Sequence, residues 1–94
     1  MPKTKAEALL LKQIETIHGK WGLTHKSEYD GKRQTVAILK VDGKYYTGHA
    51  IVSHKDTFCR WKGRVIALGR AYKNYRNGVR IELPADSFLR SLVD

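Results

Sequence analysis

Basic residues gather in one stretch of this chain that contains no acidic residue. Residues 57–81 hold no Asp or Glu, whereas they hold seven Lys and Arg side chains. Such a stretch is suited to electrostatic binding, because a local positive field attracts phosphate groups, acidic protein surfaces and anionic lipid. The seven residues are Arg60, Lys62, Arg64, Arg70, Lys73, Arg76 and Arg80.

The charge is distributed unevenly over a chain that is long enough for one domain. The 94 residues carry 18 Lys and Arg against 9 Asp and Glu, a formal net charge of +9. Residues 54–80 hold eight basic residues and one acid, whereas residues 81–94 hold one base and three acids. We expect a single domain over residues 1–94 with its positive surface in the second half of the fold.

Residues that could support catalysis or bind a metal are few and scattered. Cys59 is the single cysteine, which excludes a disulfide framework and predicts a small buried thiol. The histidines, His18, His25, His49 and His54, form no H-x-x-x-H pair, and no phosphate-binding loop or nucleophile elbow occurs. We therefore interpret the protein as a non-enzyme without metal or cofactor.

The sequence gives no signal for secretion or for insertion into a membrane. Nothing near Met1 resembles a signal peptide, and the longest apolar run covers only residues 8–11. We expect a cytoplasmic protein that has no membrane partner.

The elements that would position the basic stretch follow from periodicity and turn signals. Apolar residues at helical spacing predict a helix over residues 5–18, with a capping box from Thr4 to Glu7 and a stop at Gly19. Three strands are predicted over residues 23–29, 35–41 and 45–53, separated by turns at Asp30-Gly31 and Asp42-Gly43. These three strands predict an antiparallel meander.

A second helix carries the basic stretch. A capping box over residues 53–56 predicts its start, and Gly78 follows its predicted end near Tyr75. Residues 79–83 alternate as in a short strand, and a last helical turn is predicted over residues 86–92. The predicted fold is therefore α+β, in the order α-β-β-β-α, with both helices packed on a three-stranded antiparallel sheet.

A helical wheel divides the second helix into an apolar and a basic side. The apolar stripe consists of Phe58, Trp61, Val65, Leu68, Tyr72 and Tyr75, and the basic residues spread over the opposite arc. Gly63 and Gly69 fall within that arc, where they either allow a phosphate backbone to approach or pack against a neighbouring strand. Tyr45 and Tyr46 are adjacent on a strand, so we expect one ring to face away from the core. That ring could stack on a base or fill a partner's pocket.

The order of elements over residues 5–75 resembles the double-stranded RNA-binding domain. Residues 35–44 look like the central hairpin of that family, and Gly48-His49-Ala50 falls where the family often has two small residues before its second helix. The resemblance implies phosphate contacts from a basic cluster at the start of that helix. The corresponding stretch here is residues 53–58, and the basic residues Arg60, Lys62 and Arg64 come after it.

A second resemblance is to short phage-encoded basic proteins. It is carried by residues 46–50, 56–58 and 63–71. It implies a viral or prophage origin, and hence a location in the host cytoplasm. Small phage proteins of this kind often bind nucleic acid or block a host machine, including defence nucleases.

Three hypotheses about function follow. The first is a nucleic-acid-binding module, for DNA or RNA, that contacts mainly the phosphate backbone. The alternative is a phage anti-defence inhibitor, similar to anti-CRISPR proteins, whose basic face binds an acidic host protein or a nucleoprotein complex. The third is self-association as a homodimer through Leu9, Leu11 and one of Tyr45 and Tyr46. The predicted nucleic-acid-binding residues are Lys55, Arg60, Lys62, Arg64, Arg70, Lys73 and Arg76.

Overall fold

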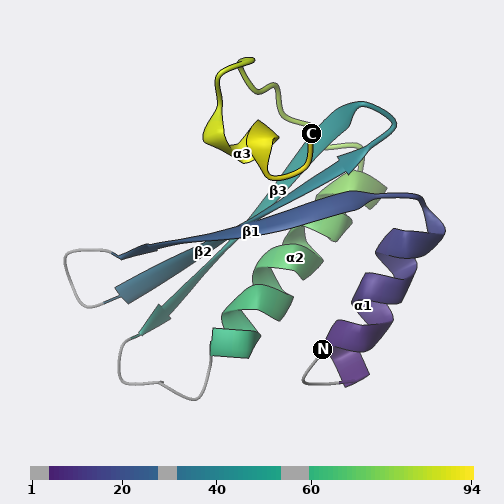
Figure 1. Ribbon diagram of the computed structural model, residues 1–94. Coiled ribbons are helices and arrows are strands. Elements are labelled where there is room, and N and C mark those ends of the chain that lie inside the picture. Colours follow the sequence, from purple (N-terminus) through teal and green to yellow (C-terminus); the bar gives the residue numbers. More distant parts are fainter. Residues whose placement is uncertain (1–4, 28–31, 54–59) are drawn as a thin grey trace.

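The structure is a computed structural model that describes residues 5–27, 32–53 and 60–94, and it confirms the predicted α+β layout. Two long helices lie on one face of a three-stranded sheet, and a short helix follows near the C-terminal end (Figure 1). In chain order the elements are α1 (Lys5–Thr16), β1 (Lys20–Ser27), β2 (Lys32–Val41), β3 (Lys44–Ser53), α2 (Arg60–Arg76) and α3 (Phe88–Ser91).

The end of α1 lies close to the predicted stop but uses a different residue for the sharp bend. His18, and not Gly19, adopts the left-handed conformation, with φ of 55°. The Gly19 amide then donates to the carbonyl oxygen of Ile14 at 2.9 Å. A Cβ on Gly19 would lie 3.0 Å from a methyl group of Ile14, which is a tight contact that Ile14 would have to relieve by a small shift. The predicted capping residue Thr4 lies outside the described residues.

The sheet is antiparallel with the order β1-β2-β3, as the turn signals predict. Asp42 and Gly43 both have positive φ, 53° and 76°, which is the conformation that a two-residue hairpin turn requires. They join Val41 and Lys44, the first pair of the β2–β3 ladder. β1 begins at Lys20, earlier than predicted, because it pairs with β2 as far as Lys40. The predicted turn at residues 30–31 lies outside the described residues.

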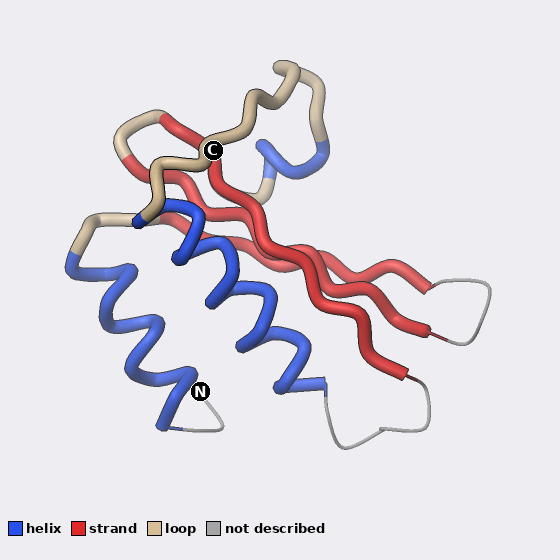
Figure 2. The backbone as a smooth tube through the Cα atoms, turned by 180° about the vertical axis from the view of Figure 1, so that it is seen from behind, coloured by secondary structure: helices blue, strands red, loops and turns tan. Residues whose placement is uncertain are grey.

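One face of the sheet is covered by both long helices (Figure 2). Ala37 and Leu39 of β2 and Tyr46 of β3 are buried there against Ala67 and Leu68 of α2. Ile14 of α1 completes the same core and is only 1% exposed. This layer fixes α2 on β3 and so determines which of its basic residues reach solvent.

The other face of the sheet is covered at the hairpin end by the C-terminal segment. Ile38, Tyr45 and Val93 form a second buried cluster, and Ile81, Leu83, Leu89 and Leu92 pack against it. Tyr45 and Tyr46 are therefore both buried, at 8% and 5% exposure. The expectation that one of these rings faces a partner is wrong, because the C-terminal segment covers the outward one.

Residues 79–83 do not form a full strand but contribute one bridge to the sheet. The amide of Ile81 donates to the carbonyl oxygen of Tyr45 at 2.9 Å. Pro84, which lacks an amide proton, follows soon after and limits further pairing. The predicted last helical turn is present as α3.

Asp94 attaches the C-terminal segment to the sheet. Its carboxylate accepts from Lys40 Nζ at 2.7 Å, from the Tyr45 hydroxyl at 2.9 Å and from Arg90 Nε at 3.1 Å. The hydrogen bond from Lys40, followed by that from Tyr45, lowers the pKa of Asp94 to about 2. This contact joins the end of the described chain to the central and edge strands.

Candidate nucleic-acid interface

The last turns of α2 present three cations to solvent. Arg70, Lys73 and Arg76 are exposed and follow one another at intervals of three residues, so each is a surface neighbour of the next. The helix Arg60–Arg76 contains no acidic residue. At 1.5 Å per residue, Arg70 and Arg76 are separated by about 9 Å along the helix axis. We call these three residues the α2 basic ridge.

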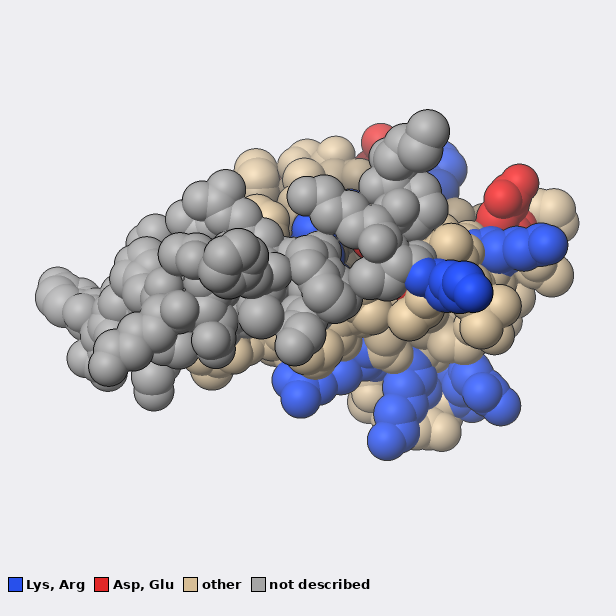
Figure 3. Space-filling view, turned by 90° about the horizontal axis from the view of Figure 1, so that it is seen from below, with Lys and Arg blue, Asp and Glu red and all other residues tan. Residues whose placement is uncertain are grey.

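The space-filling view shows how the charges are distributed. Lys and Arg side chains gather along the lower edge of the view in Figure 3, and no acidic side chain is visible among them. The acidic side chains that are most visible lie toward the upper and right parts of the view, where other Lys and Arg side chains accompany them. The group at the lower edge therefore forms a positive patch without acidic neighbours in this view.

The predicted binding residues divide into three groups. Lys55 lies outside the described residues, and Arg60 and Lys62 belong to the first turn of α2 with side chains that are not described. Arg70, Lys73 and Arg76 are exposed together. Arg64, the remaining residue whose side chain is described, is half-buried and pairs with α1.

Arg64 forms an ion pair with α1 and does not extend freely into solvent as the wheel predicted. Its Nη2 lies 2.7 Å from Oε1 of Glu7, whose side chain is only 3% exposed. The Nε of Arg64 is buried and has no hydrogen-bond acceptor among the described residues. A buried carboxylate needs a paired cation, so the position of Glu7 explains why Arg64 is drawn inward. The sequence signal for this pair was an acid within the apolar face of the first helix.

Three main-chain carbonyl groups on the free edge of β3 accept hydrogen bonds from α2 and the segment after it. Edge strands expose such groups to unwanted pairing unless they are covered. Here two of the donors are side chains on the outward part of α2, so the helix is attached along the edge of β3. The bonds run from Ile81 N to Tyr45 O (2.9 Å), from Asn74 Nδ2 to Thr47 O (2.7 Å) and from Arg70 Nη1 to His49 O (2.5 Å).

The hydrogen bond of Arg70 orients its guanidinium group and leaves other N–H donors of that group available. Its Nη1 donates to the carbonyl oxygen of His49, and a guanidinium carries five N–H donors. The remaining donors lie on an exposed side chain beside Lys73. Arg70 is thereby held in one orientation in which it can still contact a phosphate.

The two glycines of α2 lie in different surroundings. Gly63 is buried, and a Cβ on Gly69 would meet only Leu10 of α1, at 3.9 Å. The expectation that both lie on the outer basic side is therefore wrong for Gly63, whereas Gly69 is half-buried at the border between α1 and the basic ridge. Gly63, Ala67 and Ala71, spaced by four, form the small-residue face on which α2 approaches the sheet. The four-residue spacing of these small residues is visible in the sequence, but the helical wheel was interpreted from the larger aromatic residues.

Gly48 of β3 is the point of closest approach to this small-residue face. A Cβ there would overlap the carbonyl oxygen of Ala67 and lie 2.5 Å from the amide nitrogen of Ala71. Both are main-chain atoms that cannot move without shifting α2. Gly48 therefore sets the distance of α2, and of its basic ridge, from the edge of β3.

Other kinds of site find no support in the described parts of the chain. Within residues 5–27, 32–53 and 60–94, no three His, Cys, Asp or Glu side chains are grouped so that they could hold a metal ion. His49 instead bonds Gln34 through Nδ1 at 3.1 Å, and His25 bonds Thr35 at 3.0 Å. None of the described helices has the length and apolar character needed to cross a membrane.

Comparison with known proteins adds no relative. No protein-family model, curated protein or solved structure matches the chain. The resemblances to the double-stranded RNA-binding domain and to phage proteins therefore stay predictions.

Proposed function

We propose that this protein is a small nucleic-acid-binding module that contacts the phosphate backbone through the α2 basic ridge. The observation that carries the proposal is the joint exposure of Arg70, Lys73 and Arg76 on a 17-residue helix without an acidic residue. Solvated surfaces that serve only solubility usually mix the two signs of charge. The net charge of +9 extends the attraction beyond direct contacts.

The geometry of the ridge favours backbone contacts over base reading. Three cations lie within about 9 Å of helix length, whereas phosphates of one strand recur about every 3.4 Å along a duplex. Flexible Lys and Arg side chains can reach several of these phosphates without reading a base edge. We therefore expect weak sequence preference and an affinity dominated by counterion release.

Titration of the protein with labelled duplex and single-stranded oligonucleotides at increasing salt tests this function. Fluorescence anisotropy should show binding whose log Kd rises linearly with log salt concentration. We expect oligonucleotides of the same length and unrelated sequence to bind with the same affinity. Absence of binding at low salt, or an affinity that salt does not change, would contradict the proposal.

A second candidate partner is an acidic protein surface, as in a phage inhibitor of a host protein. The observation that favours it is Ile66, which is 42% exposed and lies one helical turn before Arg70. An apolar side chain beside cations is typical of protein interfaces, where it fills a pocket while the charges form the rim. Stoichiometric co-purification of one acidic protein, lost in Ile66→Asp and accompanied by no oligonucleotide binding, would favour this candidate.

A further inference from the structure

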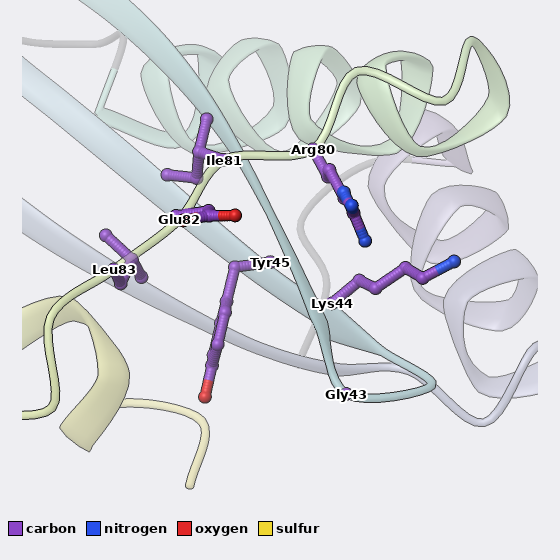
Figure 4. A pocket seen from close by; sticks show the side chains of 7 residues that line it. All are labelled: Gly43, Lys44, Tyr45, Arg80, Ile81, Glu82 and Leu83. Carbon is purple, nitrogen blue, oxygen red and sulfur yellow. The ribbon is translucent and has the colours of Figure 1, made fainter.

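A small pocket lies between the β2–β3 hairpin and the segment that follows α2. It has a volume of about 260 Å³. Figure 4 shows the side chains that surround it, from the hairpin on one side and from the C-terminal segment on the other. The lining residues are Gly43, Lys44, Tyr45, Arg80, Ile81, Glu82 and Leu83.

The walls of the pocket are held by the fold. Ile81 bonds the main chain of Tyr45, and both side chains belong to the second apolar cluster. The hairpin side is fixed by the turn at Asp42 and Gly43. The position of the pocket therefore does not depend on a ligand.

Two cations from different segments reach this pocket. The side chains of Lys44 and Arg80 extend to the same side of the opening in Figure 4. Both residues are exposed, and neither forms an ion pair or a side-chain hydrogen bond with any described residue. Glu82 also lines the pocket, and it is not within ion-pair distance of either cation in the described structure. The pocket therefore has a net positive charge that is not neutralised internally.

We propose that Lys44 and Arg80 bind one phosphate group in this pocket. An ammonium group and a guanidinium fork that approach from two sides suit a tetrahedral anion with several acceptor oxygens. Glu82 repels the same anion and keeps the affinity for an isolated phosphate low. This site adds a phosphate contact to the proposed function. It rests on that function where the phosphate is taken to belong to a nucleic-acid strand.

The edge of β3 connects this pocket to the α2 basic ridge. Arg70 bonds the main chain of His49, and Lys44 begins the same strand. Five residues of strand separate His49 from Lys44, which is about 17 Å. That length corresponds to about five nucleotides of one strand along a duplex axis. A backbone that follows the edge of β3 can therefore contact both sites.

Phosphate binding itself is tested with inorganic phosphate as the probe. In two-dimensional NMR spectra, titration should shift the amide signals of residues 43–45 and 80–83 in a saturable manner. The shifts should disappear in the double variant Lys44→Gln/Arg80→Gln. They should persist in Lys5→Gln/Lys12→Gln, which loses the same charge from the exposed side of α1. Glu82→Gln should tighten phosphate binding about threefold, because it removes a like charge. No saturable shift, or equal shifts in both double variants, would overturn the pocket site.

Oligonucleotide binding separates failure of this site from failure of the proposed function. The Lys44→Gln/Arg80→Gln variant should weaken oligonucleotide binding about tenfold and lower the salt slope by about 1, relative to the α1 control. Tight oligonucleotide binding that this variant leaves unchanged would overturn the pocket's role in the strand contact alone. Phosphate binding without oligonucleotide binding would support the pocket and contradict the nucleic-acid function. Retained signal dispersion shows that the variants fold.

Discussion

Arg64 of α2 lies 2.7 Å from the nearly buried carboxylate of Glu7 on α1, so one member of the basic stretch stabilises the fold. The pair joins two helices that cover the same face of the sheet. Removing Arg64 would take this cation away from a nearly buried carboxylate, which costs more free energy than the pair contributes. The basic stretch therefore contains residues with two different tasks.

We expect Arg64→Met to lower the free energy of unfolding by about 3 kcal/mol, because the nearly buried carboxylate of Glu7 loses the cation 2.7 Å away. The double variant Glu7→Met/Arg64→Met should recover most of that loss, since well-packed apolar residues can replace a buried ion pair. Urea denaturation of the three proteins measures this. Equal stability of the single variant and the wild type would contradict the structural role of Arg64.

Two glycines should respond in opposite directions to substitution by alanine. Gly48→Ala should destabilise the protein by about 3 kcal/mol, because its Cβ would overlap main-chain atoms of α2. Gly69→Ala should stabilise it by up to about 1 kcal/mol, because the helix gains propensity and the new methyl meets only Leu10 at 3.9 Å. Thermal unfolding of both variants provides the comparison.

The Gly69→Ala variant also tests whether glycine is needed on the binding surface. Because the substitution adds one methyl group and removes no cation, oligonucleotide affinity should stay at the wild-type value. A loss of affinity in a variant that is more stable than the wild type would show that the outer surface requires a glycine there.

The Asp94 contact predicts an acid-sensitive contribution to stability. The pKa of Asp94 in the folded protein is lowered from its ordinary value of 3.8 to about 2. Its contribution is therefore fully present above pH 3.8 and is lost as the pH falls toward about 2. The difference in melting temperature between wild type and Asp94→Asn should be largest above pH 4 and shrink below it. A difference that stays constant from pH 5 to pH 2 would contradict this linkage.

The sequence predicts the element order well because local signals agree with tertiary packing. The Asp42-Gly43 turn and the alternating side chains around it determine the β2–β3 hairpin. The apolar residues of α1, which recur at helical spacing, include those that pack in the core between the helices and the sheet. The wheel of α2 was less successful. It assumed a single buried side opposite the bases, whereas α2 contacts both β3 and α1 and so buries Gly63 and Ala67 as well.

The candidate site could be predicted only in part, since two of its features depend on contacts distant in sequence. The inward turn of Arg64 requires Glu7, which lies 57 residues earlier. The pocket at Lys44 forms only because the chain after α2 runs back along the hairpin and places Arg80 there. The hydrogen bond from the Ile81 amide to the Tyr45 carbonyl oxygen holds this segment in place. Helix and strand propensities and charge counts predict neither the Arg64–Glu7 pair nor the approach of Arg80 to Lys44.

The most direct test of the central claim compares two neutralising variants of equal charge. Lys73→Gln/Arg76→Gln removes two cations of the α2 basic ridge, and Lys5→Gln/Lys12→Gln removes two from α1. Leu10 faces α2, and at about 100° per residue Lys5 and Lys12 lie on the roughly opposite side of α1. The measurement is the slope of log Kd against log salt concentration for one duplex oligonucleotide. We expect the ridge variant to lower this slope by about 2 and the α1 variant to leave it nearly unchanged. Equal slopes in the two variants would contradict a binding surface on α2.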